Sequence, residues 1–245
     1  MRFYDSKGNL ISLERFVEMY SKAYYIGVPK INGIKYTQTS KYVECEIVRI
    51  RDNHICNYDD VYKIMAWKMG KIKQKESLTQ FVFHKDWDSG TKDAPRRYNS
   101  TIDIHRLSCY ICREIDSLEK LAENNPQECL NKLKSLNITG IGTVYLITLL
   151  FILSHGKYPI YDRFAMAALE AGTGDKIPCK NVSIHVKALP GRREKGFDNL
   201  LEGQYKKYID LLEEFKKEGF DYQKDRRVDQ ALWVYGHAFN TNNNC

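Results

Sequence analysis

The sequence predicts a mostly α-helical fold with a small β-element near the N-terminus. Apolar residues recur at helical spacing along most of the chain, capping residues precede several of these stretches, and one early segment alternates between apolar and charged residues. The chain has 245 residues, 43% of them hydrophobic, which is enough for a sizeable core. We find no linker or internal repeat and expect a single domain over residues 1–245.

The helices are expected in sequence order. Ser12 can cap a first helix over about residues 12–23, and Asp59 can cap a second. Asn125 and Pro126 favour the start of a later, short helix, because proline fits the first turn. That short helix is predicted at about 126–136, and the remaining helices at about 102–123, 143–155, 160–171, 202–218 and 226–239.

The β-element is expected within residues 26–50. Val43, Cys45 and Ile47 alternate with two glutamates, which is typical of a strand with one buried face. The pair Asn32-Gly33 favours a tight turn before it. Residues 84–101 read as a long polar loop, and loops of that length inside a domain are often functional.

The net charge of +7 suggests a polyanionic partner. Lysine and arginine gather in four short runs, and each run is either a contact for such a partner or simply a solvated surface. The runs are at 71–75, 95–97, 191–195 and 224–227.

The chain is expected to be soluble and cytoplasmic, or nucleoid-associated in a prokaryote, and monomeric. Its apolar run over 144–153 is far shorter than the ~20 residues of a membrane span, and the N-terminus lacks an apolar signal region. Seven scattered cysteines fit a reducing compartment. Cys109 and Cys112 form one Cys-x-x-Cys pair, which we interpret as buried thiols rather than a zinc or iron–sulfur site, so no metal centre is expected.

The segment "ITGIGTV" predicts an anion site made of backbone. Gly140 and Gly142 permit a tight turn before a helix that Thr143 can cap. The free N–H groups at the start of that helix, together with its dipole, attract a phosphate. A chance glycine turn in a purely structural domain is the alternative.

An aspartate follows this turn after one apolar helix. The helix, Val144–Leu153, is apolar nearly all round and should be buried, and Gly156 can end it. Pro159 then directs the chain so that Asp162 lies at the start of the next helix, where the dipole favours a carboxylate. Asp162 is either a simple helix cap or a displayed reactive group.

These residues resemble the helix-hairpin-helix DNA glycosylases, most closely the 8-oxoguanine glycosylase branch. In that family a Leu-x-Gly-[Val/Ile]-Gly turn precedes an apolar helix and a Pro-x-x-Asp segment. Ile138, Gly140, Ile141 and Gly142 match the turn, and Pro159 and Asp162 match the segment. The resemblance covers residues 130–170 and implies a glycosylase-like helical bundle.

The resemblance implies a mechanism and a set of contacts. A damaged or modified base is flipped out of double-stranded DNA, and Asp162 assists hydrolysis of its N-glycosidic bond. The hairpin binds DNA through its backbone, and no cofactor is implied other than a monovalent cation at that backbone. The DNA-binding residues implied are Gly140, Ile141, Gly142, Thr143 and Val144.

One departure from the family concerns strand cleavage. Members that also nick DNA carry a Schiff-base lysine just after the hairpin glycines, and Val144 occupies that position here. The sequence therefore predicts a monofunctional glycosylase, unless Lys68 or Lys157 substitutes. A non-catalytic DNA-binding protein of a repair or defence complex remains the alternative.

Other candidates line the base pocket by analogy with the family. They are Trp67 and Lys68 on the second helix, and Asp229, Trp233 and His237 on the last; core packing or a solvated surface is the alternative for each. His155 is expected to stabilise a helix end and to do no chemistry.

Overall fold

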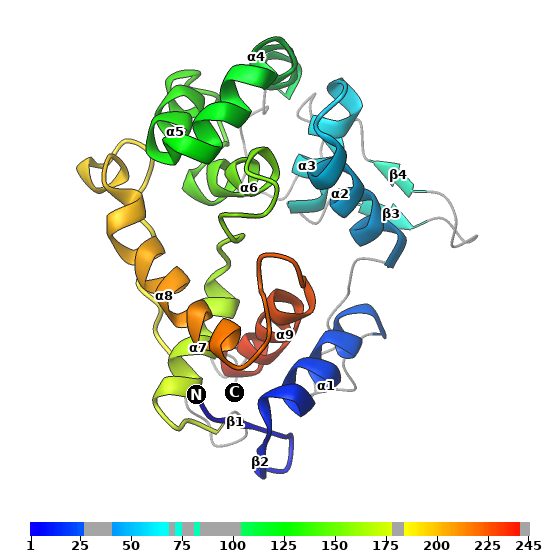
Figure 1. Cartoon of the computed structure of the whole chain (residues 1–245), viewed down its shortest axis with the longest axis vertical. Helices are drawn as coiled ribbons and strands as arrows, with labels where there is room; N and C mark the ends of the chain where they lie inside the picture. The colour runs from blue at the N-terminus through cyan, green and yellow to red at the C-terminus, as the bar shows by residue number, and fades with distance from the viewer. Residues whose placement is uncertain (27–40, 69–71, 75–80, 84–103, 178–183, 241–245) are drawn as a thin grey trace. The chain divides into compact units, whose positions relative to one another are not determined.

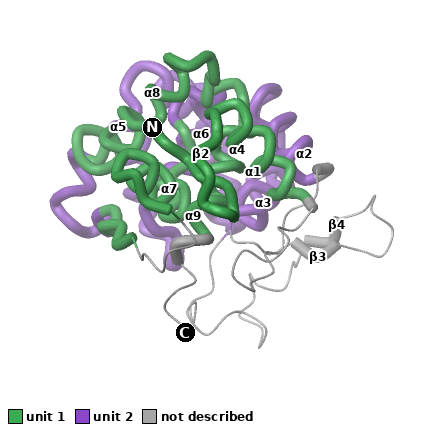
Figure 2. The backbone as a smooth tube through the Cα atoms, turned by 90° about the horizontal axis from the view of Figure 1, so that it is seen from below, with its two compact units in different colours: residues 1–38, 159–189, 200–245 green, residues 39–158, 190–199 purple. Residues whose placement is uncertain are grey.

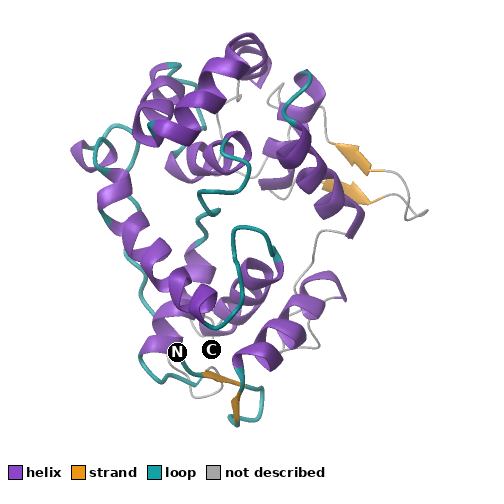
Figure 3. Cartoon of the chain, in the orientation of Figure 1, coloured by secondary structure: helices purple, strands orange, loops and turns teal. Residues whose placement is uncertain are grey.

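Helices dominate the fold (Figure 3), in a computed structural model that describes residues 1–26, 41–68, 72–74, 81–83, 104–177 and 184–240. Nine α-helices and two two-stranded antiparallel sheets lie within those ranges, which confirms the mostly α-helical class. Contacts divide the chain into two compact units, coloured separately in Figure 2. Unit 1 contains residues 1–38, 159–189 and 200–245, and unit 2 contains residues 39–158 and 190–199.

Unit 1 begins with an antiparallel pair, β1 (Phe3–Tyr4) and β2 (Leu10–Ile11), in which Phe3 lies opposite Ile11. This pair lies ahead of residues 26–50, where the sequence predicted the β-element. The helices of the unit are α1 (Leu13–Ile26), α7 (Arg163–Thr173), α8 (Gln204–Lys217) and α9 (Arg227–Asn240), with a short 3-10 helix η3 (Leu200–Glu202).

Helix α9 packs along both α1 and α7 and holds unit 1 together. Phe3 stacks on Phe16 with ring centroids 3.8 Å apart, and the edge of Tyr235 from α9 meets Phe16 at 5.3 Å. All three residues are buried, so their aromatic contacts join the β1–β2 pair to α1 and α9.

Unit 2 surrounds one central helix. Its helices are α2 (Lys41–Asn53), α3 (Tyr58–Lys68), α4 (Ile104–Asn124), α5 (Pro126–Ser135) and α6 (Thr143–Leu153), with the strands β3 (Ile72–Gln74) and β4 (Phe81–Phe83) and a 3-10 helix η2 (Lys195–Phe197). Helix α6 contacts α2, α3, α4 and α5 (Figure 1), and every residue from Leu146 to Leu153 is buried. The prediction of a buried central helix is confirmed. None of the described helices has the length and apolar character needed to span a membrane.

Most helix boundaries and two of the caps agree with the sequence predictions. Ser12 Oγ accepts a hydrogen bond from the Arg15 N–H at 3.1 Å, and the Asn125 side chain caps α5. The cap expected at Asp59 is wrong, because α3 already begins at Tyr58 and Asp59 lies inside it. Asn57 Oδ1 accepts from the Asp60 N–H at 3.1 Å and caps the helix instead.

The strand predicted over Val43–Ile47 is wrong, because these residues lie in α2. Val43, Ile47 and Ile50 follow a helical spacing and are all buried, whereas Cys45 is exposed. Residues 27–40 of the expected β-element, including the Asn32-Gly33 turn, lie outside the described residues, as does the polar loop 84–101.

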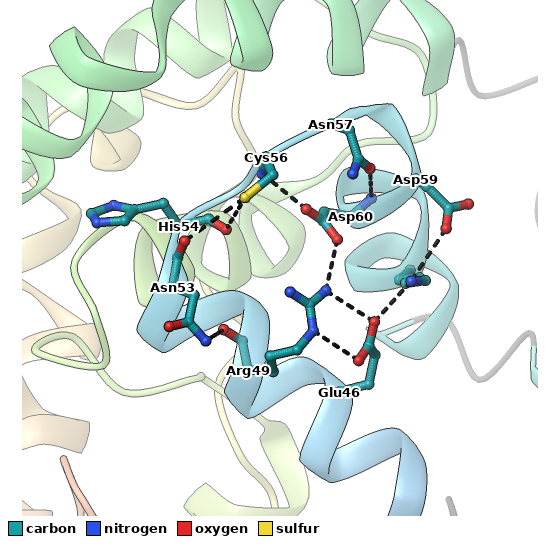
Figure 4. A network of polar contacts seen from close by, with 9 residues as sticks. Glu46, Arg49, Asn53, His54, Cys56, Asn57, Asp59 and Asp60 are labelled. Carbon is teal, nitrogen blue, oxygen red and sulfur yellow. Dashed lines mark hydrogen bonds and ion pairs between the residues drawn. The ribbon is translucent and has the colours of Figure 1, made fainter.

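Ion pairs fix α2 against α3, as Figure 4 shows. Arg49 donates to Glu46 in the same helix and to Asp60 Oδ1 in α3 at 3.1 Å, and Lys63 Nζ donates to Glu46 Oε1 at 2.8 Å. Hydrogen bonds from Arg49 and Lys63 outweigh partial burial and lower the pKa of Glu46 to about 2. The two glutamates that alternate with Val43, Cys45 and Ile47 would face solvent in a strand, but here they join α2 to α3.

Candidate functional site

The glycine turn lies between α5 and α6 in unit 2. Asn137 and Gly140 adopt positive φ values of 48° and 84°, and the Ile141 N–H donates to the Ile138 carbonyl at 3.3 Å. Ile138 and Ile141 are each only 3% exposed, so their side chains anchor the turn in the core. Because the side chain of Ile141 is buried, its predicted contact with DNA has to come from the backbone.

The N-terminus of α6 has no side-chain cap. Gly142 is the N-cap residue and makes no side-chain hydrogen bond, so the cap expected at Thr143 is wrong. Thr143 Oγ1 instead donates to the Pro190 carbonyl at 2.6 Å, which ties the hairpin to residues 190–199. The first N–H groups of α6 are thus not satisfied by a capping side chain, as a backbone anion site requires. A monovalent cation at this turn remains a prediction.

A cavity of about 590 Å³ opens beside the hairpin. Arg192 Nη2 donates to Asn137 Oδ1 at 3.1 Å, and Lys134 Nζ forms an ion pair with Asp198 at 2.7 Å. Partial burial and the adjacent Arg193 charge lower the pKa of Arg192. The cavity is lined by Asn131, Lys134, Ser135, Asn137, Arg192, Arg193 and Asp198.

The basic runs differ in how they are neutralised. Within the described part of the chain, neither Arg192 nor Arg193 forms an ion pair. In the run at 224–227, by contrast, Arg226 pairs with Asp229, and Arg227 pairs with Asp225 at 2.6 Å. The 191–195 run therefore offers positive charge to an external anion, whereas the 224–227 run is paired within the protein. The runs at 71–75 and 95–97 have no described side chains.

Asp162 lies in unit 1 as the N-cap of α7, as the sequence predicted. Its Oδ1 accepts a hydrogen bond from the Phe164 N–H at 2.8 Å, and its side chain is half-buried. The Tyr205 hydroxyl donates to the Pro159 carbonyl at 2.7 Å and anchors the segment that leads into the helix. The backbone around Asp162 is thereby fixed.

Three of the pocket candidates gather near the start of α7. His237 stacks on Phe164 with centroids 3.5 Å apart and contacts Trp233 at 3.9 Å, while Asp229 holds Arg226. Burial lowers the pKa of His237, although its hydrogen bond to the Trp233 carbonyl and the charge of Asp162 act in the opposite direction. Asp162 and His237 are thus close enough to interact.

Trp67 and Lys68 lie in unit 2, at the end of α3, and are both half-buried. Trp67 Nε1 donates to Glu44 Oε1 at 2.8 Å, and Glu44 is only 3% exposed. The indole thus has a structural hydrogen bond that joins α3 to α2. Its expected stacking on a base remains a prediction.

Val144 and Lys157, the residues on which the question of a Schiff base depends, have different surroundings. Val144, at the position of the family's lysine, is the second residue of α6 and is half-buried. Lys157 Nζ donates to the Glu123 carbonyl at 2.8 Å and lies over the Tyr158 ring.

The sequence does not mark Tyr208 as a candidate site residue. It is fully buried in α8, its hydroxyl has no described hydrogen-bond partner, and burial together with the nearby Asp229 and Asp162 charges raises its pKa well above the usual value. A tyrosine in an apolar helical stripe carries no sequence signal that separates it from core packing.

In the sequence, Arg192 and Arg193 are recognisable only as part of a charged run. A signal for them did exist, because the run follows Pro190 and has two adjacent arginines, but its position beside the hairpin depends on long-range folding.

No family model, curated protein or solved structure matches this chain.

Proposed function

We propose that this protein is a DNA glycosylase that hydrolyses the N-glycosidic bond of a damaged or modified base and leaves an abasic site. The observation that supports the proposal is the hairpin between α5 and α6, where an uncapped helix start and the nearby Arg192 and Arg193 offer positive charge. Backbone donors of this kind hold a DNA phosphate regardless of base sequence. The substrate is double-stranded DNA.

The proposed chemistry centres on Asp162. Cleavage of the N-glycosidic bond develops positive charge on the sugar after the nucleotide has been flipped out of the duplex. A carboxylate near that charge stabilises it, or takes a proton from the attacking water. Asp162 is held at a helix start beside Trp233 and His237, which are candidates for contact with the flipped base.

The proposal is for base release without strand cleavage. A Schiff base would need a lysine beside the sugar, and Val144 follows the hairpin glycines where the family's lysine would be. Borohydride trapping on a cleavable substrate tests this point. A covalent protein–DNA adduct would contradict the monofunctional proposal, and its loss in Lys68→Ala or Lys157→Ala would identify the lysine.

The decisive experiment compares the wild type with Asp162→Asn on duplexes that contain oxidised, alkylated, deaminated or hypermodified bases. Asparagine is as good a helix N-cap as aspartate, so this change removes the charge and keeps the fold. We expect release of at least one modified base by the wild type, and a rate about 100- to 10,000-fold lower in the variant. Alkali-sensitive abasic sites provide the readout.

DNA binding by the same variant is the internal control. Asp162→Asn should bind the duplex about as well as the wild type, because the proposed phosphate contacts lie at the hairpin. Release of the base at the wild-type rate by the variant would exclude Asp162 as the catalytic carboxylate.

A non-catalytic DNA-binding protein is the second candidate. The hydrogen bond from the Phe164 N–H to Asp162 favours it, because a cap alone explains why an aspartate is found there. This candidate predicts salt-sensitive DNA binding without abasic sites on any substrate. Absence of both binding and base release would exclude both candidates.

A further inference from the structure

Three possible metal ligands from distant parts of the sequence meet in unit 2. His54 follows α2, Glu119 lies in α4, and His155 follows the end of α6. One ligand atom from each lies within 4.8 Å of the others, and this is the one such group of three or more among the described residues. Figure 4 shows the imidazole of His54 directed away from the ion pairs that join α2 to α3.

The carboxylate of Glu119 lies near both imidazoles and is closer to that of His54. His54 Nδ1 is 2.8 Å from Glu119 Oε1 and 2.9 Å from Oε2, and His155 Nε2 is 4.0 Å from Oε1. The two rings meet edge-on with centroids 4.8 Å apart. Ligands that share a tetrahedral zinc ion lie about 3.3 Å apart, because each is about 2.0 Å from the metal. Small side-chain rotations would bring the three ligand atoms to that spacing.

The protein already orients His155 as a ligand. Its Nδ1 is 2.7 Å from the Arg51 carbonyl, which can only accept a hydrogen bond, so Nδ1 carries a proton. Nε2 of the neutral ring then has a free electron pair, and it is the nitrogen nearer Glu119. A backbone carbonyl that holds the opposite ring nitrogen is the usual support of a metal-binding histidine.

Both histidines have a positive backbone φ angle. His54 has φ = 70° and His155 has φ = 51°, the left-handed conformation that a residue just after a helix end often adopts. Here it directs both imidazoles to the same carboxylate.

The cluster faces a cavity of about 530 Å³. Its lining carries three carboxylates, from Asp116, Glu119 and Glu123, and two lysines, Lys120 and Lys157. The excess of negative charge favours a cation in the cavity. Side chains of His54 and His155 are 58% and 42% exposed, and solvent therefore reaches the cluster.

We propose that His54, Glu119 and His155 bind one divalent transition-metal ion of the zinc type. Two imidazole nitrogens and one carboxylate oxygen suit zinc, cobalt or nickel, whereas magnesium and calcium require oxygen ligands. Three protein ligands leave a coordination position for water, which enters from the cavity. The metal replaces the proton shared between His54 and Glu119, and that proton passes to solvent.

This site goes beyond the proposed function, and its test does not depend on base release. Tag-free full-length protein is titrated calorimetrically with Zn²⁺, Co²⁺ and Mg²⁺. We expect one Zn²⁺ or Co²⁺ per chain at this site and no Mg²⁺. His54→Ala and His155→Ala should each weaken binding by at least about tenfold, which is the loss caused even by removal of an outer hydrogen-bond partner. The double variant should lose the site.

Matched controls separate this site from other metal-binding groups. His185→Ala removes an exposed histidine outside the cluster and should leave binding unchanged. The Co²⁺ spectrum should show ligand-field bands without a thiolate charge-transfer band. If His155→Ala fails to fold by circular dichroism, Glu119→Gln provides the same comparison with a near-isosteric change.

Three results would overturn the proposal: no Zn²⁺ bound at millimolar concentration, wild-type affinity in the double variant, or a thiolate band in the Co²⁺ complex. The first would mean that His54 and Glu119 form only an ion pair. The last would assign the metal to the free cysteines.

Discussion

At the scale of single residues, Asp162 combines a structural and a proposed chemical role. Its carboxylate caps α7 and also lies near the imidazole of His237. A stability measurement separates the cap from the chemistry. We expect Asp162→Ala to lower the free energy of unfolding by about 1 kcal/mol and Asp162→Asn to leave it nearly unchanged, as measured by urea denaturation. Equal losses in both variants would mean that the charge itself stabilises the fold.

Gly142 gives a second test at this scale. A methyl group added there would meet no heavy atom within 4 Å, and the residue has a negative φ of −95°. Gly142→Ala should therefore fold with wild-type stability. The added methyl would nevertheless stand at the uncapped start of α6, where the proposed phosphate approaches. We expect weaker DNA binding in a fluorescence anisotropy titration, and unchanged affinity would argue against this turn as the phosphate site.

His237 makes stability depend on pH. Burial lowers its pKa below the ordinary value of 6.5, so the folded state keeps the ring neutral where the unfolded chain takes up a proton. Stability is then complete above about pH 6.5 and is lost as the pH falls below it, with a slope of at most about 1.4 kcal/mol per pH unit. Urea denaturation at several pH values measures this slope.

The matched variants for this prediction are His237→Gln and His185→Gln. The first should reduce the acid-side slope, because glutamine does not titrate. The second alters an exposed histidine and should leave the slope unchanged. An identical slope in the wild type and His237→Gln would show that other groups determine the acid sensitivity.

At the scale of elements, the contact of α7 with α9 depends on one missing side chain. A Cβ atom built on Gly236 would lie 1.7 Å from the Phe164 carbonyl oxygen. We expect Gly236→Ala to destabilise the protein by about 3 kcal/mol, despite the better helix propensity of alanine, because two packed backbones must separate. Thermal unfolding monitored by circular dichroism gives the measurement.

Gly142→Ala is the natural comparison for Gly236→Ala, since the same chemical change meets open space at one site and backbone at the other. Only the second should lower the melting temperature. A small effect of Gly236→Ala would mean that α7 and α9 separate easily, and the position of His237 beside Phe164 would then be adaptable.

Local patterns in the sequence were sufficient to predict α4 to α9. The apolar stripe of α8, the proline at the start of α5 and the aspartate before α7 each act within one or two helical turns. The prediction failed at α2, where Val43 and Ile47 fit both an alternating and a helical pattern. The contacts that favour the helix come from α3, including the hydrogen bond from Trp67 to Glu44, and a local pattern does not contain them.

The same limit applies to the candidate sites. Asp162 was predictable because its role as a cap is local. The position of Arg192 beside Asn137 joins residues far apart in the chain, and so does the meeting of His54, Glu119 and His155. His155 was expected only to end a helix, because its sequence neighbours give no indication of Glu119.

At the scale of the whole molecule, the hairpin belongs to unit 2 and Asp162 belongs to unit 1. The net charge of +7 describes the whole chain, but whether a given positive side chain can attract DNA depends on its own neighbours. Arg193 lines the cavity beside the hairpin without an ion pair among the described residues, whereas Arg227 is paired with Asp225. Equal changes in net charge should therefore have unequal effects on DNA binding.

The final prediction compares Arg193→Ala with Arg227→Ala over a range of salt concentrations. The logarithm of a DNA-binding constant falls with the logarithm of salt concentration by about 0.9 for each phosphate that the protein neutralises. Arg193→Ala should therefore reduce that slope by about 0.9 if this arginine contacts a phosphate. Arg227→Ala removes the same unit of charge from a cation already paired, so its slope should stay close to that of the wild type. If both variants reduced the slope equally, DNA would be responding to the overall charge rather than to the surface beside the hairpin.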